Sequence, residues 1–177
     1  MEDLHKRILI QSIQALQVET AALGMIEEEH VVFRAATGQN AGLILGRKTP
    51  LGVGIVGQAA RDGRGVVAND LAHEKNCHNE DRFGGIDMRA LLVAPIHSQG
   101  RVIGVLVAIN PVAKSFDPDA LLVMAGIGGL AGSAIQNAQL FEKLQAAHQR
   151  YRELFEDSID PMVITDWEGK VLEANRQ

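Results

Sequence analysis

Two apolar runs in the middle of the chain predict a pair of adjacent β-strands followed by a helix. Ala90 to Ile96 and Val102 to Ile109 are separated by His-Ser-Gln-Gly-Arg, and this spacing is typical of antiparallel strands joined by a short glycine turn. The helix is predicted to begin at Phe116-Asp117-Pro118-Asp119. Asp117 can accept hydrogen bonds from the first helical amides, and proline is tolerated in the first turn.

The N-terminal part of the chain predicts a helix and a hairpin. Apolar residues recur with a nearly helical period from Leu4 to Leu16, and no Pro or Gly interrupts residues 2–18. Residues 20–26 and 30–36 then predict two strands joined at Glu27-Glu28-Glu29. The segment from Gly38 to Pro50 is expected to be a loop that contains a short strand at residues 43–45.

Glycines delimit the next elements. Gly54 is expected to precede a short helix that ends at Asp62-Gly63, where glycine can adopt the left-handed C-terminal conformation. Gly65 to Asp70 then predicts a strand. The segment from Ala72 to Asp87 follows it and is expected to be a loop.

The last helix, predicted from Asp119 to His148, contains four glycines that each cost up to about 1 kcal/mol relative to alanine. Gly128 and Gly132 lie one turn apart, so we expect a sheet or a second helix to approach closely there. Further along, apolar and small residues form a stripe that suits pairing with another helix. Core packing within one chain explains this stripe equally well, and the stripe alone does not separate the two. Its members are Ile127, Ala131, Ala134, Ala138 and Phe141.

Together these elements resemble a GAF domain over residues 1–147. The motifs that carry the resemblance are Leu-Leu-Val-Ala-Pro-Ile, Gly-Arg-Val-Ile-Gly-Val-Leu, Phe-Asp-Pro-Asp and a helix ending in Ala-Ile-Gln-Asn-Ala. The resemblance implies an α/β (α+β) fold with a central antiparallel sheet of about five or six strands. It also implies N- and C-terminal helices on one face, a loop-covered pocket on the other, and homodimerisation through those two helices. The resemblance implies that the chain senses a small molecule rather than catalysing a reaction.

The sequence changes character from Tyr151 onward. A Phe-containing helix, a strand that ends in Thr165-Asp166, a glycine turn and a strand that ends in Ala174-Asn175 resemble the opening of a PAS domain. Residues 148–177 are therefore expected to be a connector and an incomplete PAS domain. This layout is similar to that of bacterial two-component sensor histidine kinases and cyclic-dinucleotide enzymes. The resemblance implies an output domain, a histidine kinase or a diguanylate cyclase, beyond Gln177.

The charge and the cysteine content limit the classes of partner and the cellular compartment that we expect. The net charge is −5 and no basic stripe is present, which argues against nucleic acid and anionic membrane surfaces. No apolar run reaches the ~18 residues that cross a bilayer, so no membrane insertion is expected. The single cysteine, Cys77, excludes an internal disulfide and fits a reducing compartment. We expect a cytoplasmic protein.

The most reactive side chains lie around Cys77. His73, Cys77 and His78 match no common zinc spacing, so no metal is expected. The Cys-His pair, followed by Arg89-Ala90, resembles the bilin attachment of photosensory GAF domains, but aromatics are only 4% and would not clamp a tetrapyrrole. GAF-type methionine sulfoxide reductases use more than one thiol, so no enzymatic activity is expected.

A cyclic nucleotide is likewise unsupported. Cyclic-nucleotide GAF domains carry Asn-Lys, then Phe, then Asp-Glu after the last strand, whereas here Asn110 is followed by Pro111 and the Asp-Glu pair is missing. Asn110, Phe116 and Asp119 are expected to fix the strand-to-helix turn. The ligand is thus an unknown small molecule.

A ligand pocket is expected beneath the loop of residues 72–87, because such cavities form where loops cover an apolar sheet face. A ligand that prefers the loop-closed state would shift the population, and the long helix would report the shift. The competing interpretation is a ligand-free dimerisation module whose cavity its own side chains fill. The predicted lining residues are Ile55, Val67, Asn69, Asp70, His73, Phe83, Met88 and Leu92.

Overall fold

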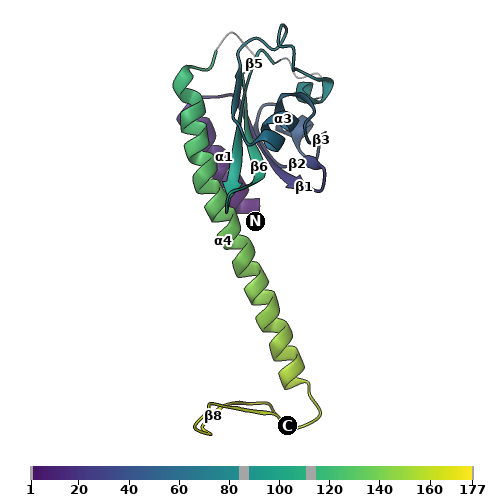
Figure 1. The fold of residues 1–177 in the computed structure, drawn as a ribbon, viewed down its shortest axis with the longest axis vertical. Helices are drawn as coiled ribbons and strands as arrows, with labels where there is room; N and C mark the ends of the chain where they lie inside the picture. Colours follow the sequence, from purple (N-terminus) through teal and green to yellow (C-terminus); the bar gives the residue numbers. More distant parts are fainter. Residues whose placement is uncertain (1, 84–87, 111–114, 177) are drawn as a thin grey trace. The chain divides into compact units, whose positions relative to one another are not determined.

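The computed structural model describes residues 2–83, 88–110 and 115–176. The chain divides into two compact units, Met1–Gln136 and Asn137–Gln177. The first unit contains a six-stranded sheet with helices on both faces, and the second contains a two-stranded sheet (Figure 1). The predicted fold class is confirmed. The predicted domain boundary after residue 147 stays a prediction.

The six-stranded sheet is antiparallel throughout and has the order β3-β2-β1-β6-β5-β4. Both predicted hairpins are confirmed, since β1 pairs with β2 and β5 pairs with β6. The two edge strands span three residues each, which leaves little free edge for another chain to pair with. The strands are β1 (Thr20–Glu27), β2 (His30–Gly38), β3 (Lys48–Pro50), β4 (Val66–Ala68), β5 (Ala90–Ser98) and β6 (Arg101–Asn110).

Helices cover both faces of this sheet (Figure 1). On one face lie α1 (Glu2–Leu16) and the first part of α4 (Pro118–Glu156). On the other lie α2 (Ala41–Ile44) and α3 (Gly54–Asp62). The expected strand at residues 43–45 is wrong, because the chain forms α2 there and pairs with β2 later, through β3. A short apolar run does not distinguish one helical turn from a strand.

Two apolar cores result, one on each face of the sheet. The core that packs against α1 and α4, called here the helix-side core, includes Leu92 and Ile96 of β5. The core that packs against α2 and α3, called here the roof-side core, includes Leu91 and Val93 of the same strand. Successive side chains of a strand point to opposite faces. Since both faces are covered, β5 reads as one continuous apolar run instead of an alternation.

Close contact between α4 and β5 depends on two glycines. A Cβ atom on Gly128 would lie 3.0 Å from the carbonyl oxygen of Pro95, and one on Gly132 would overlap the carbonyl oxygen of His97. On Gly129 it would meet nothing within 4 Å. The predicted close approach is confirmed, and the neighbour is a strand of the same chain rather than a second helix.

The start of α4 agrees with the sequence prediction. The backbone N–H of Ala120 donates to Asp117 Oδ1 at 2.7 Å, so Asp117 caps the helix as expected. The helix continues to Glu156, beyond the predicted end at His148. By length and composition α4 is also apolar enough to cross a membrane, and a third of its most apolar window is buried. The core helix of a soluble protein passes the same test.

The second unit consists of the end of α4 and a small hairpin. Strand β7 (Val163–Thr165) pairs antiparallel with β8 (Val171–Ala174), and Asp166 Oδ1 accepts from the amides of Glu168 and Lys170 in the turn. The predicted strand-turn-strand order is therefore present. The assignment of this unit to a PAS domain stays a prediction.

Candidate functional site

The segment that covers the roof-side core, residues 70–83, is called here the roof segment. Its 3-10 helix η1 (Asn79–Arg82) carries Asp81, which is fully buried. The amides of Ile55 and Val56, in the first turn of α3, donate to the Asp81 carboxylate at 2.8 and 3.1 Å. The amide of His78 donates to the same carboxylate at 2.9 Å. A carboxylate at a helix N-terminus satisfies free amides and interacts favourably with the helix dipole.

Glycine is required at the first residue of α3. Gly54 has a φ of 66°, and a Cβ atom there would overlap the carboxylate of Asp81. The glycine-bounded start of α3 therefore serves the roof segment, because it admits Asp81 to the helix N-terminus. The other end of α3 agrees with the sequence prediction, since Gly63 adopts the left-handed C-cap conformation with φ 65°.

Phe83 fills the space beneath the roof segment. It is fully buried, and its ring meets that of Phe33 edge to face, with centroids 5.1 Å apart. Its φ of 39° places it in the left-handed region, which a bulky side chain rarely adopts. Strain of this kind costs on the order of 1–3 kcal/mol and persists where the surrounding structure enforces it.

The eight predicted lining residues fall into three groups. Ile55, Phe83 and Met88 belong to or pack against the roof-side core, on the expected face. Leu92 and Val67 pack in the helix-side core, so their placement beneath the roof segment is corrected. The strand alternation is shifted by one residue relative to the prediction, and a shift of one exchanges the two faces.

The remaining three, Asn69, Asp70 and His73, are exposed. Asn69 bonds the backbone of Phe116 with its side chain. Asp70 Oδ2 lies 2.9 Å from His73 Nδ1, and this hydrogen bond holds the pKa of Asp70 below its ordinary value. That the other six predicted residues contact a ligand stays a prediction.

Asp81 was missed as a site residue by sequence reasoning. Its partners in α3 lie 25 and 26 positions earlier in the chain, and no local motif marks such a separation. The one available signal was Gly54, because a glycine at the first position of a helix indicates that another group approaches it closely.

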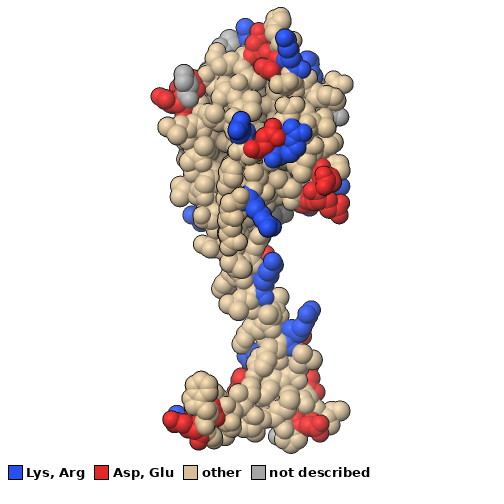
Figure 2. Space-filling model, in the orientation of Figure 1, with Lys and Arg blue, Asp and Glu red and all other residues tan. Residues whose placement is uncertain are grey.

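Among residues 2–83, 88–110 and 115–176, no group of three His, Cys, Asp or Glu side chains could hold a metal ion. On the face drawn in Figure 2, Lys and Arg of the described residues are interspersed with Asp and Glu, without a continuous basic area.

We expect the Cys77 thiol to react slowly with iodoacetamide. Burial, and secondarily the charge of Asp81, raise the pKa of the Cys77 thiol above its ordinary value of 9.0. Only the thiolate is nucleophilic, so less of the reactive form is present at about pH 8 in the folded protein than in the unfolded chain. The folded protein should alkylate more slowly than the same chain in urea, with mass spectrometry as the readout. Equal rates would contradict the raised pKa.

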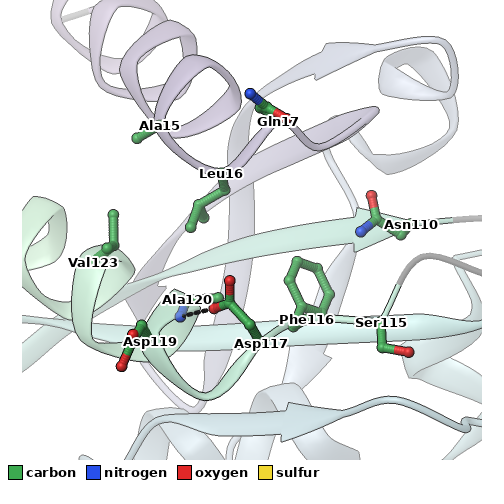
Figure 3. A pocket seen from close by; sticks show the side chains of 10 residues that line it. All are labelled: Ala15, Leu16, Gln17, Asn110, Ser115, Phe116, Asp117, Asp119, Ala120 and Val123. Atoms are coloured by element: carbon green, nitrogen blue, oxygen red, sulfur yellow. Dashed lines mark hydrogen bonds between the residues drawn. The ribbon is translucent and has the colours of Figure 1, made fainter.

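A cavity of about 270 Å³ lies where α1 ends and α4 begins (Figure 3). Leu16 and Gln17 reach it from the end of α1, Asn110 from the end of β6, and Phe116 and Asp117 from the residues before α4. Asn110 is buried next to this junction, in keeping with its predicted structural role.

The sequence was compared with family models and with known proteins. The family model of the GAF domain matches residues 1–136. A probable 3',5'-cyclic phosphodiesterase, pde-5, of Caenorhabditis elegans is 32% identical over 103 residues, which is 56% of this chain and 14% of that protein. The chain thus spans only about a seventh of this relative.

Several solved structures share the fold. The GAF domain from a phosphoenolpyruvate-protein phosphotransferase of Coxiella burnetii has a TM-score of 0.70 at 19% identity, over 80% of this chain and 86% of that one. The GAF-B domain of DevS from Mycobacterium smegmatis has 0.68 at 20%, over 80% and 97%. A free methionine-R-sulfoxide reductase from Neisseria meningitidis has 0.62 at 23%, over 78% and 83%. At these identities the likeness shows the fold alone.

Proposed function

Because the chain belongs to the GAF domain family, which comprises small-molecule sensing and regulatory domains of signalling proteins, we propose that it senses a small molecule in its roof-side core. In this proposal the bound state regulates an output domain of a multidomain protein, a histidine kinase or a diguanylate cyclase. In this proposal residues 148–177 are the connector and the beginning of a PAS domain that lies between the sensing domain and the output domain. Cys77 is the only thiol in the sequence, so in this proposal the sensing part does not carry the two-thiol chemistry of the sulfoxide reductases.

The observation that carries this proposal is the state of Phe83. A fully buried ring on a strained backbone, at the end of a segment that the carboxylate of Asp81 ties to α3, is a plug that a ligand can replace. Displacement of Phe83 releases the backbone strain and offsets part of the cost of opening the core. A ligand that occupies the vacated space favours the displaced state and shifts the population.

The surface of α4 supports homodimerisation as part of the proposal. In the first unit, Leu122 and Leu130 are 75% and 77% exposed. A groove of about 420 Å³ lies beside them, lined by Leu121 and Gly129 of α4 and by Pro95 and His97 of β5. Exposed leucines next to an apolar groove favour a protein partner. In this proposal the partner is α4 of a second copy.

A second candidate function, a ligand-free interaction module, is favoured by the packing of the roof-side core. Phe33, Phe83 and Ile44 are fully buried there, so the chain's own side chains fill the place of a ligand. In this alternative the fold positions α4 for dimerisation, and the roof segment stays closed.

Native mass spectrometry of the gently purified chain, compared with its denatured mass, tests the proposal. We expect a dimer that carries a reproducible extra mass, and this mass should be lost on denaturation because no covalent attachment is proposed. Hydrogen exchange at residues 78–83 should differ between the loaded and the stripped protein, since the ligand displaces Phe83. A bare dimer from several hosts would favour the interaction module, and an adduct that survives denaturation would point to Cys77.

A further inference from the structure

Backbone hydrogen bonds tie the start of the roof segment to the sheet through Arg89, the residue before β5. The Leu71 amide donates to the Arg89 carbonyl oxygen at 3.0 Å, and the Arg89 amide donates to the Asn110 carbonyl oxygen at 3.1 Å. These bonds continue the pairing of β4, β5 and β6 past the ends of the strands. Leu71 and Arg89 thus form a closed neck beside Asn110, the last residue of β6.

The side chain of Asn69, which lies at this neck, bonds the backbone of Phe116, the residue before the cap of α4. Its Nδ2 donates to the Phe116 carbonyl oxygen at 3.0 Å, and the Phe116 amide donates to its Oδ1 at 2.8 Å. The side chain thus bonds both polar groups of one residue, as a β-strand partner would. Aspartate could keep only the bond from the Phe116 amide, and alanine neither, because a carboxylate has no donor.

Phe116 connects Asn69 to α4 through packing and through the helix cap. Its side chain is buried in the helix-side core with Ala120, whose amide is capped by Asp117. At the other end of β4, Gly65 lies against α4, since a Cβ atom there would come within 2.5 Å of Leu121. The two residues that flank β4 therefore lie against Leu121 of α4 and against Phe116, which precedes α4. Of these, Asn69 is the one adjacent to the roof segment.

We propose that Asn69 couples the roof segment to α4. When the roof segment opens, the neck moves, the two bonds to Phe116 weaken, and the first turn of α4 loosens. With Asn69 removed, the roof segment opens without any effect on α4. This inference deepens the proposed function, because it names the residue through which the sensing face regulates the helix.

The test is a double-mutant cycle measured by hydrogen-exchange mass spectrometry on the 177-residue chain. Asp81→Asn loosens the roof segment, and Asn69→Ala removes the coupling. We expect Asp81→Asn to raise the exchange rate of residues 116–124 about fivefold when Asn69 is present, and less than about twofold in the double variant. Asn79→Ala, an exposed asparagine within the roof segment, serves as the matched control and should leave residues 116–124 unchanged.

Peptides from residues 91–96 of β5 serve as the internal reference, because their exchange reports global opening. An equal effect of Asp81→Asn on residues 116–124 with and without Asn69, or no effect in either background, would overturn the proposal. Should the double variant fail to fold, Asn69→Asp replaces Asn69→Ala. The effect of Asp81→Asn on the exchange rate of residues 116–124 must then be intermediate. No ligand is needed, so a negative result here leaves the native mass spectrometry test of sensing to be decided separately.

Discussion

Replacing Asp81 by alanine is expected to lower the free energy of unfolding by about 3 kcal/mol. The change removes the acceptor for the amides of Ile55, Val56 and His78, and leaving a buried donor without a partner costs about 1–3 kcal/mol. The three penalties are not additive, because the roof segment can open and expose these amides to water. Urea denaturation followed by circular dichroism measures the change.

Two companion variants separate the carboxylate's role from a general effect of mutating the roof segment. Asp81→Asn keeps one acceptor oxygen but loses the charge at the N-terminus of α3, so we expect a smaller loss of about 2 kcal/mol. Glu74→Ala changes a partly exposed acid in the same segment and should stay within about 0.5 kcal/mol. A loss for Asp81→Ala no greater than that of Glu74→Ala would refute the role assigned to Asp81.

Replacing Gly132 by alanine is expected to destabilise the fold, although alanine is the better helix former. The new Cβ atom would overlap the carbonyl oxygen of His97, and a backbone atom in a paired strand cannot move aside as a flexible side chain can. Overpacking costs about 1–3 kcal/mol, and here we expect the upper end. After the gain of about 1 kcal/mol in helix propensity, the net loss is about 2 kcal/mol.

Gly129→Ala is the matched control, on the same helix and with open space around its Cβ position. It should stabilise the protein by up to about 1 kcal/mol, so the two variants shift the melting temperature in opposite directions. If both raise it, then α4 does not pack against β5 as described. If Gly132 served dimerisation instead, its replacement would change the dimer affinity with little loss of fold stability.

Local patterns predicted most of the secondary structure. The β5–β6 hairpin, the cap at Asp117 and the C-terminal Gly63 of α3 all follow from residues within a few positions of one another. Which side of β5 faces which core did not follow, because a strand covered on both faces has no polar residues to mark its orientation. Leu92 was therefore assigned to the wrong face.

The polar contacts that hold the site were beyond sequence reasoning for a different reason. Asp81 and Asn69 each bond backbone atoms of a distant segment, and any backbone amide or carbonyl can be the partner. The identity of the partner residue then carries no signal. Asn69 was predicted from its position to line a ligand pocket, whereas its side chain bonds the backbone of Phe116.

The closed neck makes the roof an exchangeable part. Since the Leu71 amide holds the Arg89 carbonyl, the chain leaves and rejoins the sheet at one place, whatever sequence runs between them. Doubling the length of such a loop costs only about 0.6 kcal/mol in closure entropy. A replacement loop that retains a carboxylate to accept hydrogen bonds from the first amides of α3 could thus be grafted without redesign of the sheet. New ligand specificities could then be selected from a library of such loops on one unchanged sheet.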